Sequence, residues 1–257
     1  MNAKAAVVIP ARYASTRLPG KPVLEVAREV TGRYIIQHVY ERAQRAERAD
    51  RVIVATDDRR ILEAVREFGG EARMTAADHR SGTDRIAEVA RDLKAEIIVN
   101  VQGDEPEIRP QQVDNVIRLL EHQGAVMGTL AHPIVTREEW MDPNVVKVVL
   151  DGEGAALYFS RSPIPNLRDY DGPLAEAPAR PLQHLGIYSY RREFLLGYGD
   201  LPPSPLERAE SLEQLRALHS GHRIRVGVTP WRSIGIDTPH DLERWLQKHR
   251  EGEAGQD

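Results

Sequence analysis

Residues 5–22 read AAVVIPARYASTRLPGKP, and this stretch decides the fold. Its first five residues are small or β-branched and end abruptly at Pro10, a pattern typical of a strand that is buried on both faces. Ligands of open α/β sheets bind beyond the carboxyl ends of such strands. We therefore expect residues 10–22 to form a binding loop at the end of the first strand.

The binding loop carries three cations, Arg12, Arg17 and Lys21. Two forked guanidinium groups and one compact ammonium suit the spread charge of a triphosphate, and Pro19 and Gly20 predict the turn that presents Lys21. Surface arginines are usually only solvated, but three cations directly after a buried strand favour phosphate binding. The loop matches neither the Walker A pattern nor Gly-x-Gly-x-x-Gly, which argues against a P-loop ATPase and a dinucleotide dehydrogenase.

Strand and helix patterns alternate along the rest of the chain. Short apolar runs predict strands, and apolar residues at helical spacing predict helices. The expected elements are helix 34–43, strand 51–58, helix 60–68, a helix around 86–90, strand 96–101, helix 110–122, strand 125–131, a hairpin of 142–151 with 155–160, a surface loop at 166–181, strand 184–191, helix 205–218, strand 224–228 and a final helix after 238. This order predicts an α/β fold with a mainly parallel central sheet flanked by helices, and a smaller antiparallel hairpin region.

Length and composition limit the class of protein. The 257 residues have a net charge of -4 and include no cysteine. The balanced charge does not indicate a surface that binds nucleic acid. The lack of cysteine excludes disulfides, thiolate nucleophiles and Cys-ligated zinc. No apolar run is long enough to span a membrane or to serve as a signal peptide. We expect one domain over 1–251, a disordered tail over 252–257, a cytoplasmic location, and neither nucleic acid nor membrane as partner.

Acidic residues follow the strand at 96–101. Asp104 and Glu105 lie at its carboxyl end, at the sheet edge where the cationic loop is expected. An isolated Asp after a strand is usually a turn residue or a helix cap. A triphosphate brings Mg²⁺, however, and proteins hold this ion with one or two carboxylates together with substrate phosphates. If Asp104 faces the loop, its position predicts that it is a magnesium ligand.

Two further segments allow a structural or a functional interpretation. In SGTDR, at 81–85, Ser81 or Thr83 can cap the following helix, or the segment can read the edge of a base because Gly82 admits a close backbone approach. Period-two spacing places His184 and Tyr188 on one face of their strand. A histidine at the start of a strand is, by itself, more often packed than functional.

Motifs spread over nearly the whole chain resemble one family. The chain contains, in order, IPARYASTRLPGKP at 9–22, SGTDR at 81–85, NVQGDEP at 100–106, PNVVKVV at 143–149, ALYFSRSPIP at 156–165, HLGIY at 184–188, LEQLR at 212–216 and GIDTP at 235–239. They resemble the 3-deoxy-manno-octulosonate (Kdo) cytidylyltransferases. The resemblance implies a Rossmann-like fold of the nucleotide-diphospho-sugar transferase type. The chain departs from the family pattern between Pro22 and Gln37, where it is longer, and this leaves the start of the first helix open.

The resemblance also implies roles for individual residues. The implied CTP contacts are Ala11, Arg12, Arg17, Lys21, Ser81, Gly82, Thr83 and Asp104, of which Lys21, Arg12 and Asp104 are the implied catalytic residues. The implied sugar contacts are Gln102, Arg161, His184, Tyr188, Glu213 and Gln214. Asp104 and Asp237 are the implied ligands of Mg²⁺, the implied cofactor. Lys147 would either help to position ligands or lie on a solvated strand face.

The implied reaction transfers CMP from CTP to the anomeric hydroxyl of Kdo, with release of pyrophosphate, for lipopolysaccharide biosynthesis in a homodimeric cytoplasmic enzyme. The cations and carboxylates support such chemistry, because the site must neutralise phosphate charge and hold the nucleophile in line. Two alternatives remain at this point. The substrate could be another acidic sugar, 8-amino-Kdo or a sialic acid, or the chain could be a nucleotide-binding protein without catalysis. The presence of Lys21, Asp104 and Asp237 together argues against the last.

Overall fold

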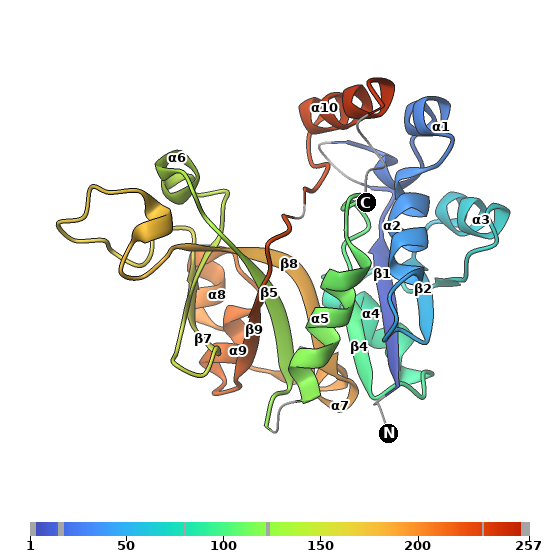
Figure 1. The fold of residues 1–257 in the computed structure, drawn as a ribbon. Helices are drawn as coiled ribbons and strands as arrows, with labels where there is room; N and C mark the ends of the chain where they lie inside the picture. The colour runs from blue at the N-terminus through green and yellow to red at the C-terminus, as the bar shows by residue number, and fades with distance from the viewer. Residues whose placement is uncertain (1–3, 15–17, 80, 122–123, 233, 253–257) are drawn as a thin grey trace. The chain divides into compact units, whose positions relative to one another are not determined.

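The computed structural model describes residues 4–14, 18–79, 81–121, 124–232 and 234–252. The chain divides into two compact units, unit 1 with residues 1–114 and 233–257 and unit 2 with residues 115–232 (Figure 1). That the two units form one domain over 1–251 stays a prediction. No helix among the described residues is long and apolar enough to cross a membrane.

Unit 1 contains a parallel sheet in the strand order β3-β2-β1-β4. Its strands are β1 (Ala5–Ala11), β2 (Arg51–Thr56), β3 (Ala72–Met74) and β4 (Ile97–Asn100). Val7, Val8 and Ile9 are completely buried, as expected for a strand covered on both faces. The predicted parallel sheet, with the first strand inside it, is therefore confirmed.

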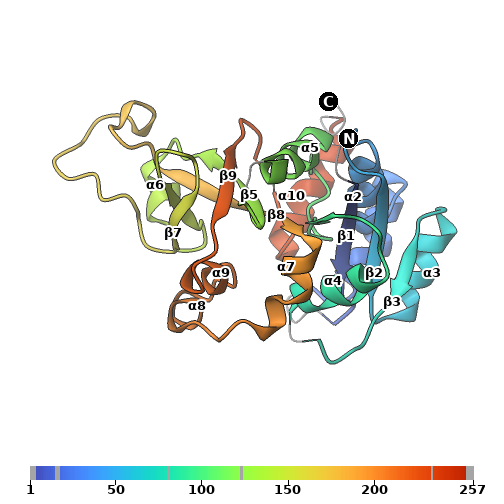
Figure 2. The ribbon, with the colours of Figure 1, turned by 90° about the horizontal axis from the view of Figure 1, so that it is seen from below.

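Helices cover both faces of this sheet. Those of unit 1 are α1 (Glu25–Thr31), α2 (Ile35–Gln44), α3 (Arg59–Glu67), α4 (Gly82–Arg91), the start of α5 (Pro110–Arg118) and α10 (Pro239–Arg250). Helices α2 and α4 lie on opposite faces (Figure 2). Ser81 caps α4 and Thr238 caps α10, each through a capping box, because their hydroxyls accept amide hydrogens that the first helical turn leaves unpaired. Of the two caps that the sequence allowed for α4, Ser81 is the one observed, and the cap at Thr238 begins the expected final helix.

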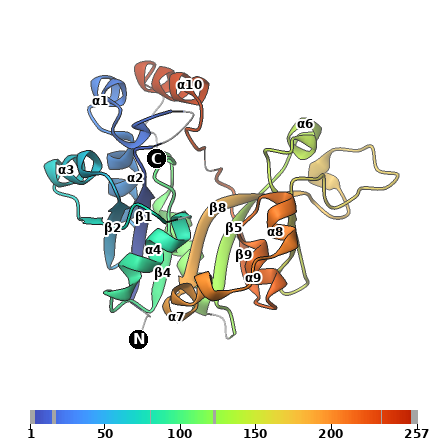
Figure 3. The ribbon, with the colours of Figure 1, turned by 180° about the vertical axis from the view of Figure 1, so that it is seen from behind.

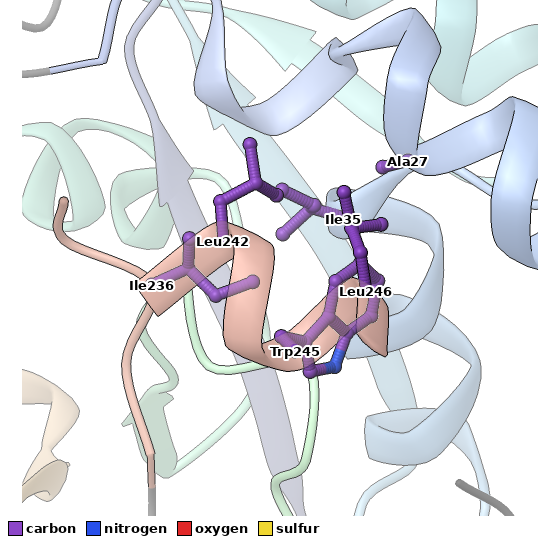
Figure 4. Packing of buried hydrophobic residues seen from close by; sticks show 6 residues of the cluster. All are labelled: Ala27, Ile35, Ile236, Leu242, Trp245 and Leu246. Carbon is purple, nitrogen blue, oxygen red and sulfur yellow. The ribbon is translucent and has the colours of Figure 1, made fainter. Parts of the chain in front are cut away.

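Helix α1 was not predicted, and it occupies the longer segment between Pro22 and Gln37. Ala27 of α1 and Ile35 of α2 pack against Leu242, Trp245 and Leu246 of α10 (Figure 4). The same apolar cluster includes Ile236, in the loop that leads into α10. The extra helix thus helps to anchor the C-terminal helix and the loop before it.

Unit 2 is built on strand β5 (Met127–Pro133), which lies between β8 (Leu182–Arg191) and β9 (Ile224–Val228) (Figure 3). Strand β8 runs antiparallel to β5, and β9 runs parallel to it. The predicted hairpin is confirmed as the antiparallel pair β6 (Lys147–Leu150) and β7 (Ala156–Ser160). The helices of unit 2 are α6 (Arg137–Met141), α7 (Arg192–Leu196), α8 (Pro205–Glu210) and α9 (Leu215–His219).

The prediction of one continuous helix over 205–218 is wrong. Helix α8 ends at Glu210, Ser211 has a left-handed backbone with φ of 52°, and α9 begins at Leu215. The carboxylate of Glu210 accepts hydrogen bonds from the hydroxyl of Ser160 and the backbone N–H of Arg161. These tertiary bonds hold the end of α8, and the following residue turns away from the helix axis.

In two other segments the observed structure differs in detail from the prediction. The helix over 110–122 is α5 followed by a 3-10 turn at Leu119–Glu121. The loop at 166–181 is mostly irregular, but a 3-10 turn at Leu174–Glu176 anchors it. Leu174 is buried against Ile134 and Trp140, so the loop has a core contact of its own.

Candidate functional site

Lys21 lies between two carboxylates in unit 1. Its Nζ is 2.6 Å from Oδ2 of Asp104 and 3.4 Å from Oδ1 of Asp237. The Lys21 side chain is largely buried, whereas half of the Asp237 side chain is exposed. The structure therefore brings together three predicted site residues from distant parts of the chain.

The chain forms the expected turn just before Lys21. Gly20 has a φ of 70°, and its N–H donates to the carbonyl of Tyr13 at 2.9 Å. A Cβ at this position would lie 3.0 Å from the Tyr13 ring, and its backbone conformation is one that side chains disfavour. Lys21 follows at the start of a 3-10 turn, Lys21–Val23.

Two contacts that the sequence analysis missed position the carboxylates. A Cβ on Gly103 would lie 2.9 Å from the carbonyl oxygen of Pro10, so glycine lets the loop that carries Asp104 approach the end of β1. The N–H of Ile236, one residue before Asp237, donates to the carbonyl of Asp104 at 2.9 Å. The glycine in NVQGDEP was an available signal, whereas a backbone hydrogen bond leaves none in the sequence.

Arg12 and the segment before α4 are joined. Nη2 of Arg12 donates to the carbonyl of His79 at 2.6 Å and to that of Ser81 at 3.3 Å. Ser81 Oγ accepts the N–H of Asp84 at 3.1 Å, so capping occupies this hydroxyl. A Cβ on Gly82 would meet Pro10 at 3.6 Å, an ordinary contact, and the chain itself does not require glycine there. A role of Gly82 towards a ligand stays a prediction.

Arg85 is a further buried cation of unit 1. Its side chain is inaccessible to solvent, and Nη2 donates to Oδ2 of Asp57 at 2.7 Å. Nη1 donates to the hydroxyl of Thr75. The guanidinium thus ties α4 to the end of β2 and to the segment after β3. The SGTDR motif contains this arginine, but the sequence analysis assigned it no role.

The remaining unit 1 predictions are placed as follows. Ala11 ends β1, and Thr83 is buried in the first turn of α4. Nε2 of Gln102 donates to Oδ1 of Asn100 at 3.4 Å. Arg17 lies outside the described residues, as does the tail after Gly252.

His184 and Tyr188 lie side by side in unit 2, with ring centroids 5.4 Å apart, as period-two spacing predicted. His184 is only 9% exposed, and its Nε2 is 3.0 Å from Oγ1 of Thr129. Burial lowers the pKa of His184 to about 3, so the ring is neutral near pH 7. The rings of His184 and Phe159 pack in a T-shaped arrangement, with centroids 4.9 Å apart.

Arg161 is held by backbone carbonyls. Its Nε donates to the carbonyl of Glu210 at 2.7 Å and its Nη1 to that of Pro143 at 3.0 Å. Lys147 is completely buried, and its Nζ donates to the carbonyls of Asp142 and Arg161 at 2.8 Å and 2.6 Å. Burial lowers the pKa of Lys147. The alternative of a solvated strand face for Lys147 is therefore wrong.

Glu213 and Gln214 lie between α8 and α9. The hydroxyl of Tyr198 donates to the carbonyl of Glu213 at 2.8 Å. Gln214 is 3% exposed, and its Nε2 has no hydrogen-bond partner among the described residues. Because a buried amide without a partner is costly, this group is suited to a ligand acceptor.

The carboxylates of unit 1 fit a divalent cation. Mg²⁺ typically takes one or two protein carboxylates and completes its shell with water and substrate phosphates. Asp104 and Asp237 already share one cation, the ammonium of Lys21. Within the described ranges no group of three or more His, Asp or Glu side chains is placed to hold a metal, so a metal here would rely on substrate oxygens as well. Cations and carboxylates on one edge of a parallel sheet suit the handling of a metal-bound polyphosphate.

The chain is similar to known proteins over most of its length. Residues 6–224 match the cytidylyltransferase family. A 3-deoxy-manno-octulosonate cytidylyltransferase of Geobacter sulfurreducens is 55% identical over 94% of this chain and 97% of its own length. A protein of the same name from Solibacter usitatus is 53% identical over 92% of this chain and 91% of its own length.

Solved structures agree with these relatives. The structure of CMP:2-keto-3-deoxy-manno-octonic acid synthetase complexed with CTP matches with a TM-score of 0.89 and 46% identity, covering 97% of this chain and 100% of that one. The 4-diphosphocytidyl-2C-methyl-D-erythritol synthase of Anaerococcus prevotii matches with a TM-score of 0.60 over 99% of this chain and 97% of that one. At 13% identity, this second likeness concerns the fold alone.

Proposed function

This chain belongs to the 3-deoxy-manno-octulosonate cytidylyltransferase family, and we propose that it transfers CMP from CTP to the anomeric hydroxyl of Kdo. The observation that carries the proposal is the arrangement of Lys21 between Asp104 and Asp237. This places a cation and two carboxylates beside the loop whose other cations suit a triphosphate.

The reaction forms a bond between the anomeric oxygen of the sugar and the α-phosphorus, and it breaks the bond from that phosphorus to the pyrophosphate oxygen. The proton of the attacking hydroxyl is released, and CMP-Kdo and pyrophosphate are the products. Lys21 and Arg12 would donate hydrogen bonds to phosphate oxygens, where negative charge must be stabilised as the pyrophosphate leaves. Arg17 is assigned to the same task by the family resemblance.

Asp104 and Asp237 would hold Mg²⁺ together with substrate oxygens. When bound, the ion supplies charge neutralisation on the phosphates and lowers the pKa of a coordinated hydroxyl. Lys21 would then serve two purposes, because its ammonium can stabilise phosphate charge and keep the two carboxylates in place. A neutral side chain at position 21 would lose both.

Kdo recognition is assigned to residues that the family resemblance implies. They are Gln102, Arg161, His184, Tyr188, Glu213 and Gln214. The unpartnered Nε2 of buried Gln214 supports this assignment, because it is a donor that a sugar oxygen or carboxylate would satisfy. Ala11, Ser81, Gly82 and Thr83 would contact the cytidine part of CTP. We also propose a homodimer in the cytoplasm that supplies lipopolysaccharide synthesis, in keeping with the family.

The experiment that tests the function is pyrophosphate release from CTP and Mg²⁺ with Kdo, 8-amino-Kdo or N-acetylneuraminate in parallel. Release with Kdo is the expected result. Preference for another of the acids would keep the chemistry and change the substrate. Folded protein that binds CTP but is silent with all three acids would instead support the non-catalytic alternative.

Asp237→Asn tests the carboxylate role in the same assay. We expect it to reduce kcat by about a hundredfold or more, since it removes a group that would act through electrostatics at the reacting phosphates. Asp92→Asn is the matched control because the Asp92 side chain is 81% exposed on the surface of unit 1. Full activity in Asp237→Asn would contradict the proposal.

A further inference from the structure

We propose that Thr129 fixes the proton of His184 on Nε2, so that Nδ1 is left as an acceptor for a hydroxyl group of the sugar. Thr129 is then a positioning residue for substrate recognition, although the sequence analysis assigned it no role. The proposal rests on the proposed function for the identity of the sugar, but its proton assignment follows from this chain's own hydrogen bonds.

The assignment comes from counting protons around one hydroxyl. Oγ1 of Thr129 lies 2.7 Å from the carbonyl oxygen of Ile187 and 3.1 Å from that of Leu185. A hydroxyl has one hydrogen, and carbonyl oxygens can only accept. The hydrogen of Thr129 must therefore go to a carbonyl, because otherwise two oxygens would face its lone pairs without a proton between them.

His184 then has to be the donor in the third contact. Its Nε2 is 3.0 Å from the same Oγ1, and that oxygen has already used its hydrogen. The neutral imidazole has one donor and one acceptor nitrogen, so protonation at Nε2 leaves a lone pair on Nδ1. Nδ1 makes no hydrogen bond to any described residue.

A distortion of the sheet makes this arrangement possible. Thr129 of β5 pairs with Tyr188 and Leu130 with Leu185, so the register shifts between Thr129 and Leu130. The extra residues in β8 bring the carbonyls of Leu185 and Ile187 to one hydroxyl, which regular pairing would not do. Thr129 itself is completely buried, and water does not compete for its oxygen.

The consequence concerns the kind of group that His184 can recognise. A neutral ring that offers a lone pair accepts a hydrogen bond from a hydroxyl, whereas it would repel a carboxylate. Burial lowers the pKa of His184 and so keeps the ring uncharged at neutral pH. A neutral ring is also what the hydrogen bonds of Thr129 require, with the proton on Nε2 and none on Nδ1. His184 therefore contributes to the selection of a hydroxyl of the sugar, and the sugar carboxylate is left to donors such as the amide of Gln214.

The first test observes the proton directly. The full chain, with ¹⁵N-labelled histidine, is examined by NMR at neutral pH, and His184 is assigned by comparison with His184→Gln. We expect Nε2 to show a one-bond proton coupling and Nδ1 to have the shift of an unprotonated nitrogen. Kdo should move the Nδ1 resonance in the direction of hydrogen-bond acceptance. A proton on Nδ1, or an imidazolium ring, would overturn the inference.

The second test separates positioning from packing. Thr129→Val keeps the shape of the side chain and removes the hydroxyl, whereas Thr129→Ser keeps the hydroxyl. We expect Thr129→Val to raise KM for Kdo about tenfold, as loss of one buried hydrogen bond does, with KM for CTP unchanged and near-native values in Thr129→Ser. Equal effects on both substrates, or none, would refute the role of Thr129. Lack of Kdo turnover by the native chain would refute the proposed function, while the tautomer measurement would still decide the proton assignment.

Discussion

Mild acid should destabilise this protein, because it holds two neutral histidines, the buried His184 and the half-buried His38. Burial lowers the pKa of both His38 and His184 from 6.5 to about 3. The unfolded chain binds protons on these rings at higher pH than the folded chain does. The resulting stability is fully present above pH 6.5 and is lost as the pH falls from there towards 3.

The size of the effect follows from the linkage relation. Each histidine contributes a slope of about 1.4 kcal/mol per pH unit inside this window. Between pH 6.5 and pH 5 the loss is about 2 kcal/mol for each ring, or about 4 kcal/mol for the pair, against a typical total stability of about 5–15 kcal/mol. His132 acts in the same direction, because burial also lowers its pKa.

Urea unfolding at a series of pH values measures this slope. The native chain should take up at least about two protons on unfolding near pH 5.5, since His132 adds to the uptake of His38 and His184. His38→Gln should take up one fewer, even if its stability at neutral pH changes, because the slope depends on titration and not on packing. If units 1 and 2 unfold in separate steps, His38 takes up its proton in one step and His184 in the other. The proton uptake summed over both steps stays the same. An uptake below one proton in the native chain, or an unchanged slope in His38→Gln, would refute the reasoning.

Three substitutions test other contacts. Gly103→Ala should lower kcat by about a hundredfold in the pyrophosphate assay, because the new Cβ displaces the loop that carries Asp104 and small misplacements of catalytic groups are costly; native activity would show that the loop can adjust. Arg85→Met should lower the free energy of unfolding by about 3–5 kcal/mol, measured in urea, since it leaves the carboxylate of Asp57 without its buried partner; a change within 1 kcal/mol would contradict this. Lys147→Met should raise KM for Kdo more than KM for CTP, because Lys147 holds the backbone of Arg161, an implied sugar contact. It should also lower the free energy of unfolding by about 1–3 kcal/mol, because two carbonyls lose their donor. An effect on stability alone would show that Lys147 does not position the substrate.

Features that depend on short stretches of chain were predictable from the sequence. The first strand of unit 1 follows from one apolar run, and its parallel partners follow from the alternation of strands and helices. Thr238 and Ser81 are N-caps because capping is decided within four residues. Lys21 and Asp104 were predicted to be close because the ends of parallel strands share one edge of the sheet.

Features that depend on distant contacts were not predictable in the same way. The leucines after Pro205 have the spacing of one helix, but that helix ends where the carboxylate of Glu210 accepts hydrogen bonds from residues 50 and 49 positions away. The period-two pattern of β6 places Lys147 on a face and cannot tell whether that face is covered. Its ammonium donates to backbone carbonyls from two loops. Every residue type has a backbone carbonyl, so the sequence does not mark such partners.

The two neutral histidines, His38 and His184, show why both kinds of information are needed to identify a site. In unit 1, His38 Nε2 lies 2.9 Å from the hydroxyl of Thr31, which in turn is 2.8 Å from the carbonyl of Ala27. The same proton count makes His38 a donor through Nε2, so a threonine–histidine pair is not by itself a mark of ligand binding. His38 packs against Trp245, with ring centroids 5.2 Å apart, and this contact links α2 to α10. Only the HLGIY motif distinguishes His184, and only the hydrogen bonds of Thr129 specify what His184 can accept.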